Sequence, residues 1–96
     1  MKNQFFSQVS AFNNDVIGYK APESIELLPD DVKKLSLIQL REEISELETA
    51  QTKTEQIDAV IDLVYFAYGC LYKMGLSEKQ FSKIATLVHT ANMTKA

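Results

Sequence analysis

The stretch KTEQIDAVIDLVYFAYGCLYKM, residues 53–74, decides the fold. It contains no proline and is long enough for roughly six turns of α-helix. Its apolar side chains recur at spacings of four and three, which is the period of a helical stripe: Ile57, Ile61, Val64, Tyr68 and Leu71. Thr52 followed by Glu55 is the capping-box pattern of a helix start, and Gly75 is suited to a helix end. The stretch therefore predicts one long helix.

The rest of the chain also reads as helices joined by short connections. Apolar spacing predicts a helix over residues 2–17, which Gly18 ends. A second helix is predicted from Pro29, as its first helical residue, to about residue 50, and the last helix covers about residues 77–93. Ser77 with Gln80 repeats the capping-box pattern. We expect a single all-α domain over residues 1–96, with four to five helices in an antiparallel bundle.

Composition limits what this domain does and with what it associates. Apolar residues make up 46% of the 96 residues, which is ample for a folded globule. Several of the predicted helices are apolar on more than one side, and a lone bundle of this length could not cover that surface, so oligomerisation is expected to complete the bundle, as a homodimer or homotetramer. The 10 basic and 13 acidic residues give a net charge of −3, which argues against a nucleic-acid polymer as partner. No basic recognition helix supports a helix-turn-helix protein.

Other sequence features indicate a cytoplasmic protein. The single cysteine, Cys70, excludes an intrachain disulfide and is expected to be a buried structural residue. Asp58 and Asp62 interrupt the most apolar region, so no membrane span is expected. No continuous apolar segment follows Lys2, so no signal peptide is expected.

Pairs of carboxylates at helical spacing are the candidates for chemistry. Asp58 and Asp62 lie four residues apart and are the only charged residues within residues 57–72. An ionised carboxylate in an apolar setting needs compensation, and no basic residue at helical spacing supplies it. Glu43 and Glu46 share a face of the preceding helix, which is expected to lie antiparallel to residues 53–74.

Four carboxylates facing one another would bind a hard divalent cation, Mg²⁺ or else Mn²⁺. Such an ion binds phosphate oxygens and activates water. The competing interpretation is that these residues form ordinary solvated helix faces. That interpretation is at least as strong for Glu42, Glu48 and Glu55 taken singly.

The carboxylate pattern also resembles a known family. Glu42-Glu43-x-x-Glu46, the segment Asp58-Ala59-Val60-Ile61-Asp62-Leu63-Val64-Tyr65 and the tail Asn92-Met93-Thr94-Lys95 together resemble the all-α nucleotide pyrophosphatase superfamily. That superfamily includes MazG-like proteins, dimeric dUTPases and phosphoribosyl-ATP pyrophosphatases, and the last branch is the most similar.

The resemblance implies a magnesium-dependent hydrolase that cleaves a nucleotide between its α and β phosphates, giving a nucleoside monophosphate and pyrophosphate. It implies metal ligation by Glu43, Glu46, Asp58 and Asp62. Glu42 and Glu43 are the expected catalytic residues, Glu42 as a further ligand or as the group that orients water. The residues expected to contact the nucleotide are Asn13, Tyr65, Asn92 and Lys95.

Three alternatives stay open at the level of sequence. Relatives carry Glu-x-x-Asp where this chain has Ala59 and Asp62, so either Glu55 or Asp62 pairs with Asp58 at the metal. The stripe of Tyr65, Tyr68 and Tyr72 is more typical of a core or subunit interface than of a base-stacking surface. A non-catalytic acidic helical module, which oligomerises or binds nucleotides, is the alternative function; it would be favoured if the carboxylates diverged.

Overall fold

The computed structural model describes residues 3–95, and within them every regular element is helical. The elements are α1 (Gln4–Ala11), a π-helical segment η1 (Phe12–Ile17), α2 (Asp30–Thr49), α3 (Lys53–Lys73) and α4 (Glu78–Lys95). The predicted all-α fold is confirmed, and the residues described contain no strand. Helix α2 begins one residue later than predicted, because Pro29 occupies the N-cap position rather than the first turn.

The helix ends follow the local signals in the sequence. Thr52 and Glu55 form the predicted capping box at the start of α3. Ser77 and Gln80 bond reciprocally at the start of α4, through side-chain oxygens that accept from backbone N–H groups at 2.9 and 3.1 Å. Gly75 has a φ of 95°, and a Cβ there would lie 2.8 Å from the carbonyl oxygen of Ser24, so only glycine fits this junction.

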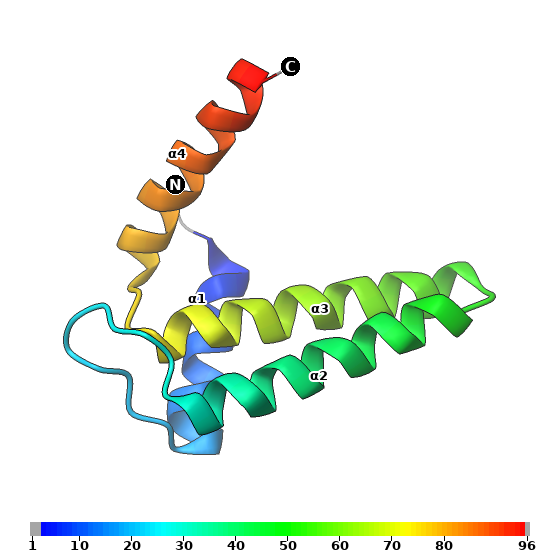
Figure 1. Cartoon of the computed structure of the whole chain (residues 1–96), viewed down its shortest axis with the longest axis horizontal. Helices are drawn as coiled ribbons and strands as arrows, with labels where there is room; N and C mark the ends of the chain where they lie inside the picture. The colour runs from blue at the N-terminus through cyan, green and yellow to red at the C-terminus, as the bar shows by residue number, and fades with distance from the viewer. Residues whose placement is uncertain (1–2, 96) are drawn as a thin grey trace.

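Helices α2 and α3 form an antiparallel hairpin, and α1 with η1 packs against one end of it (Figure 1). The first predicted helix differs from the expectation of one regular helix, since its last six residues are π-helical. The Asn13 side chain donates to the carbonyl oxygen of Val9 at 2.9 Å, and so competes with the backbone ladder at the point where the π-helical turns begin. Gly18, with a φ of 79°, ends the segment as predicted.

Aromatic rings join α1, α3 and the start of α4. Phe6 is fully buried and stacks on Phe81 with 4.4 Å between ring centroids, and Tyr68 packs edge-on against both rings. Phe5 makes similar edge contacts with Tyr65 and Tyr68 at 5.8 Å. Tyr65 and Tyr68 of the tyrosine stripe thus pack against other aromatic rings. The hydroxyl group of Tyr72 donates to the carbonyl oxygen of Tyr19 at 2.7 Å.

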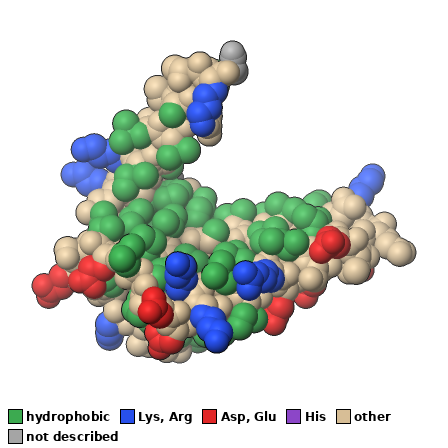
Figure 2. All heavy atoms as spheres, viewed as in Figure 1, with side chains coloured by type: hydrophobic (Ala, Val, Ile, Leu, Met, Phe, Trp, Pro, Cys, Tyr) green, Lys and Arg blue, Asp and Glu red, His purple; other side chains and the backbone are tan. Residues whose placement is uncertain are grey.

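The single chain is extended rather than compact. Its radius of gyration is 14.6 Å, whereas a compact domain of this length has a value of about 12.5 Å. Helix α4 leaves the hairpin as a separate arm (Figure 1), and apolar side chains are visible along the arm, at its base and on the hairpin (Figure 2). Much of the apolar surface is therefore left uncovered by the chain itself.

Candidate metal and nucleotide site

The side chains that α2 turns toward α3 are polar. The buried residues of α2 are Ser36 and Glu43, while its apolar residues Leu37 and Ile44 are exposed. Counting back from Glu46 at spacings of three, four and three gives Glu43, Gln39 and Ser36, which places all four on one helical stripe. The groove between α2 and α3 is therefore lined on the α2 side by hydrogen-bonding groups rather than by a leucine core.

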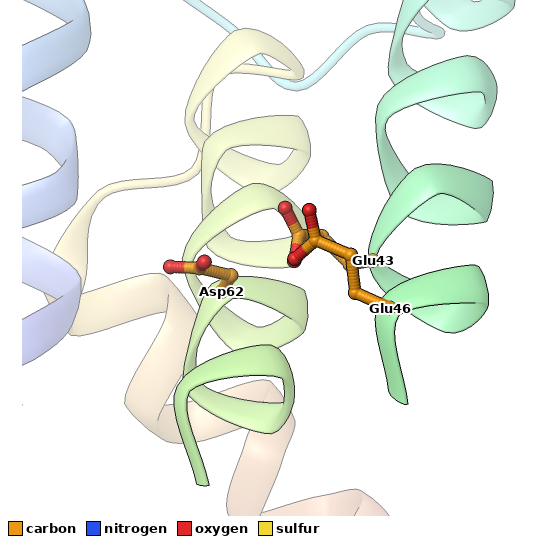
Figure 3. A group of neighbouring side chains, drawn as sticks. All are labelled: Glu43, Glu46 and Asp62. Carbon is orange, nitrogen blue, oxygen red and sulfur yellow. The ribbon is translucent and has the colours of Figure 1, made fainter. Parts of the chain in front are cut away.

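Three carboxylates meet across this groove. Oxygen atoms of Glu43, Glu46 and Asp62 all lie within 4.8 Å of one another, and we call these residues the carboxylate cluster. Glu43 and Glu46 extend from α2 toward α3, which carries Asp62 (Figure 3). The predicted convergence of the two helices' acidic residues is thus seen for these three side chains.

Glu43 is the buried member of the cluster. Its side chain is 9% exposed, and its buried Oε2 atom has no hydrogen-bond partner among the described residues. Burial, a hydrogen bond with Glu46 and the negative charges of Glu46, Asp62 and Asp58 raise the pKa of Glu43 from 4.5 to about 7. A buried acid without a cation is therefore driven toward its protonated form.

Asp62 shows the same effect from the other helix. Partial burial comes first, and the charges of Asp58 and Glu46 add to it, so the pKa of Asp62 is raised. Asp58 itself is exposed and is not one of the three residues of the carboxylate cluster. Its negative charge nevertheless raises the pKa of both Glu43 and Asp62. No basic side chain within residues 3–95 lowers the pKa of Glu43 or Asp62. The negative charge of the cluster is therefore not balanced by a positive charge acting on these two residues.

These residues fit a hard divalent cation. All the converging donors are carboxylate oxygens, which Mg²⁺ and Mn²⁺ prefer, and the unpartnered Glu43 Oε2 is a ligand atom without another use. Glu55, the alternative partner of Asp58, accepts instead from the backbone N–H groups of Gln51 and Thr52 at 3.1 and 3.0 Å. These bonds lower the pKa of Glu55 and keep its carboxylate at the helix start.

A cavity of about 200 Å³ lies beside the cluster along the same groove. We call it the amide cavity, and its lining residues come from η1, α2 and α3: Phe12, Asn13, Ile17, Leu35, Ser36, Gln39, Tyr65, Phe66, Gly69 and Lys73. Gln39 lies four residues before Glu43, and Phe66 lies four residues after Asp62, so the cavity begins one helical turn from the carboxylates.

Asn13 is held rigidly in this cavity. It is 7% exposed, its Nδ2 donates to the carbonyl oxygen of Val9, and its Oδ1 accepts no bond from the described residues. A Cβ at Gly69 would lie 3.4 Å from Nδ2, so the absence of a side chain there leaves room for the amide. The structure thus places two predicted nucleotide contacts, Asn13 and Tyr65, in one cavity next to the cluster.

Other predicted site residues lie outside the carboxylate cluster within one chain. Glu42 is exposed and lines a shallow surface with Arg41, Ser45 and Glu46, so it borders the cluster without being part of it. Asn92 and Lys95 are exposed on the last turns of α4, which points away from the hairpin (Figure 1). Their roles stay predictions.

Sequence reasoning missed Ser36, Gln39 and Lys73. Ser36 and Gln39 were detectable, because counting back from Glu43 by four and then three reaches both. Lys73 lines the far end of the amide cavity, and its Nζ lies 5.5 Å from the ring centroid of Tyr19. No local pattern marks this lysine, since its contact depends on the path of the loop after Gly18. Cys70 is a free, half-buried thiol.

The geometry defines an all-α protein with an acidic groove between two antiparallel helices. The sequence model of the phosphoribosyl-ATP pyrophosphohydrolase family matches residues 16–92, and the chain belongs to this family, which is part of the all-α NTP pyrophosphatase superfamily. Family membership implies pyrophosphohydrolase activity, and the acidic cluster is consistent with a metal site. No curated protein and no solved structure is significantly similar to the chain.

Within residues 3–95, no single helix combines the length and apolarity needed to cross a membrane. The pair α3 and α4 passes that test only when joined, and it is bent by 116°.

Proposed function

We propose that the chain is a magnesium-dependent hydrolase that cleaves a nucleoside triphosphate between its α and β phosphates, releasing a nucleoside monophosphate and pyrophosphate. The observation that carries the proposal is the environment of the buried Glu43 carboxylate. Its Oε2 atom has no hydrogen-bond partner among the described residues, and two more carboxylates, Glu46 and Asp62, lie next to it. Family membership supplies the reaction class. The activity is assigned to one domain over residues 1–96.

Each acidic residue of the predicted site has a role in this reaction. Glu43, Glu46 and Asp62 would hold Mg²⁺, with Mn²⁺ as a substitute, and Asp58 would complete the site from the exposed side of α3. The ion, when bound, polarises phosphate oxygens and activates water. Water adds across the anhydride, one P–O bond forms as another breaks, and the proton of water passes to a carboxylate. We assign this base role to Glu42 or Glu43.

The amide cavity holds the nucleoside end of the substrate. It lies one turn along the groove from the carboxylates, so phosphates at the cluster leave the base and sugar directed toward Asn13 and Tyr65. Its volume of about 200 Å³ is below the roughly 300–1,000 Å³ of pockets for drug-sized ligands, which suits a ring rather than a whole nucleotide. Asn13 Oδ1 and the second N–H of its amide are free to bond a base edge.

The active form is a homodimer or a larger homo-oligomer. The chain exposes 7218 Å², whereas a monomeric protein of 10.9 kDa exposes about 5,600 Å². The excess of roughly 1,600 Å² is larger than the ~800 Å² that each partner buries in a standard interface. Association of copies accounts for this surface. A cytoplasmic location stays a prediction from the sequence.

The test is pyrophosphate release from a panel of ribonucleoside and deoxyribonucleoside triphosphates and phosphoribosyl-ATP, with and without Mg²⁺. Glu46→Ala and Asp62→Ala are compared with Glu48→Ala, which removes the same charge from an exposed position of α2. We expect metal-dependent release that both cluster variants reduce by two or more orders of magnitude, while Glu48→Ala retains it. If the wild type cleaves nothing on the panel, the non-catalytic helical module replaces the hydrolase.

A further inference from the structure

A second cavity adjoins the amide cavity at Ser36, which lines both. Its volume is about 370 Å³, and we call it the loop cavity. Its walls come from the loop before α2, the first half of α2 and the last turns of α3, and their apolar members are Leu27, Leu28, Leu37, Leu40, Cys70 and Met74. The three residues of the carboxylate cluster do not line it. The loop cavity is therefore separate from the metal site.

The loop that forms one wall is fixed by its backbone. The Glu26 N–H group, one residue before Leu27, donates to the carbonyl oxygen of Met74 at 2.9 Å. The carbonyl oxygen of Ser24 approaches Gly75 so closely that a Cβ there would lie 2.8 Å away. The loop runs from the end of η1 past the end of α3 to the start of α2 (Figure 1). The wall is therefore set by main-chain contacts, as in a pre-formed ligand site.

The loop cavity suits a small apolar molecule. Its volume lies within the roughly 300–1,000 Å³ of small-molecule pockets. Leucines, a thiol and a thioether form most of its wall. An apolar molecule that enters removes its own surface and that of the wall from water, which is favourable. Leu27 at the rim is 88% exposed and Leu37 is 39% exposed, so both side chains gain from being covered.

One buried polar group in this wall has no partner. Ser36 is only 5% exposed, and its hydroxyl group forms no hydrogen bond with the described residues. Serines inside helices often donate to the carbonyl oxygen four residues earlier, which here belongs to Val32, but Ser36 does not. A buried hydroxyl without a partner is costly. A molecule that bonds to Ser36 therefore gains this bond without breaking another one within the protein.

The polar groups of the wall define the polar part of the ligand. Asp30 and Lys33 are exposed residues of the lining with opposite charges, so a net charge on the ligand is attracted by one and repelled by the other. The Ser36 hydroxyl and, more weakly, the Cys70 thiol can donate hydrogen bonds. A neutral molecule with an acceptor, such as a ketone carbonyl, matches these groups. An apolar side chain of a second copy would instead leave the Ser36 hydroxyl unpaired.

Ser36 also connects the loop cavity with the nucleoside end of the groove. It lies on the stripe of α2 that carries Gln39 and Glu43, and it lines the amide cavity together with Asn13. A hydroxyl group has one O–H to donate. When a ligand in the loop cavity accepts this bond, a nucleoside in the amide cavity loses the same donor. The two ligands then weaken each other's binding, and linkage makes the factor the same in both directions.

We propose that the loop cavity binds a neutral, mainly apolar small molecule with a carbonyl-type acceptor, which takes the Ser36 O–H and thereby weakens binding of the nucleoside in the amide cavity. The effect on the nucleoside rests on the proposed function, whereas binding in the loop cavity does not. The loop cavity is then an inhibitory effector site.

Protection of Cys70 tests the binding. Cys70 is the only cysteine of the sequence and lines the cavity, so its rate of labelling by N-ethylmaleimide reports on occupancy. Acetophenone, a neutral aromatic ketone, is the probe; labelling is followed by mass spectrometry of the full chain and compared with glutathione in the same solution. We expect saturating acetophenone to slow the labelling of Cys70 at least threefold. Benzoate, of similar size but charged, should give less protection at the same concentration.

Ser36→Ala separates the hydrogen bond from the apolar contacts. The concentration of acetophenone that gives half-maximal protection should rise about fivefold, the value of one net hydrogen bond. Ser45→Ala is the matched control, because Ser45 is an exposed serine of the same helix outside the cavity lining, and it should protect like the wild type. Equal protection of the wild type and Ser36→Ala overturns the proposal, as does equal protection by benzoate.

Steady-state kinetics tests the effect on the nucleoside. With a nucleotide that the wild type cleaves, acetophenone should raise KM about fivefold and change kcat little, whereas it should leave the KM of Ser36→Ala unchanged. An unchanged wild-type KM overturns the inhibitory role. Labelling of Cys70 that slows with protein concentration alone shows that a second copy fills the cavity, which also overturns the proposal. If acetophenone protects Cys70 through Ser36 while no nucleotide is cleaved, the hydrolase proposal fails and the binding site stands.

Discussion

Glu43 of α2 and Asp62 of α3 place carboxylate oxygens within 4.8 Å of each other across the hairpin, and burial is the largest cause that raises the pKa of each. Two acidic side chains from different helices are thus held close together, and no lysine or arginine within residues 3–95 lowers the pKa of either. The free energy of unfolding of the metal-free chain should therefore depend on pH.

The metal-free protein should be less stable at pH 8 than at pH 5. The pKa of Glu43 rises from 4.5 to about 7 on folding, so its contribution is fully present below pH 4.5 and is lost as pH rises through about 7. The loss is on the order of 2–3 kcal/mol, given about 1.4 kcal/mol per pKa unit. Thermal unfolding in EDTA across this range measures it.

Glu43→Gln is the matched variant for that measurement. It keeps the shape of the side chain without its charge, so its Tm in EDTA at pH 8 should exceed that of the wild type and should change less with pH, with the raised pKa of Asp62 as the remaining source of pH dependence. Magnesium should raise the Tm of the wild type and leave the variant unchanged. A wild-type Tm that climbs from pH 5 to pH 8 in EDTA would contradict the role of Glu43.

Glu55 and Asp62 should separate stability from metal binding. Glu55→Ala removes the two bonds that this carboxylate accepts, from the backbone N–H groups of Gln51 and Thr52, and should lower the free energy of unfolding by about 1 kcal/mol, with Mg²⁺ affinity unchanged. Asp62→Ala should weaken Mg²⁺ binding at least tenfold and leave the metal-free protein as stable or more so. Calorimetric titration with denaturant unfolding distinguishes the two; the reverse pattern would assign the metal to Glu55.

Asn13→Ala should act mainly on substrate binding. The amide cavity loses one of its buried hydrogen-bonding side chains, so KM should rise several-fold with a smaller change in kcat. The lost bond to the Val9 carbonyl should lower stability by about 1 kcal/mol. Steady-state kinetics of Asn14→Ala, which lies outside the cavity lining, is the control. An unchanged KM for Asn13→Ala would remove this residue from the nucleotide site.

Leu87→Asp should weaken association of the copies. It places a charge among the exposed apolar side chains of α4, next to Ile84 and Val88, where burial in a partner would be costly. Thr86→Asp introduces the same charge about 160° from Val88, on the opposite face, and should have no effect. Sedimentation velocity over a concentration series measures both. Equal assembly of the two variants would show that this face is not covered by a second copy.

The sequence predicts the helices well because their signals are local. Thr52 with Glu55 and Ser77 with Gln80 are short-range pairs, and each forms the bonds that the pattern indicates. The convergence of Glu43 and Glu46 with Asp62 was also predictable, since a short connection forces α2 and α3 to lie antiparallel.

Other features depend on relationships that one sequence does not encode locally. Which face of α2 turns inward could not be read from hydrophobicity, because Ser36 and Glu43 are buried while Leu37 is exposed. The π-helical turns follow from a side chain competing for the Val9 carbonyl. The divergence of α4 depends on the loop that packs against Gly75.

The π-helical segment gives the nucleotide cavity an unusual sensitivity to chain length. A π-helical turn holds more residues than an α-helical one, so loss of a single residue after Asn13 would allow the helix to continue as a regular α-helix. The positions on one side of the deletion would then turn by about 100° relative to the others. An in-frame deletion of one codon in this segment would therefore turn Ile17, which lines the cavity, relative to Asn13, which stays bonded to Val9, and the ratio of kcat/KM between two nucleotides would reveal the altered base preference.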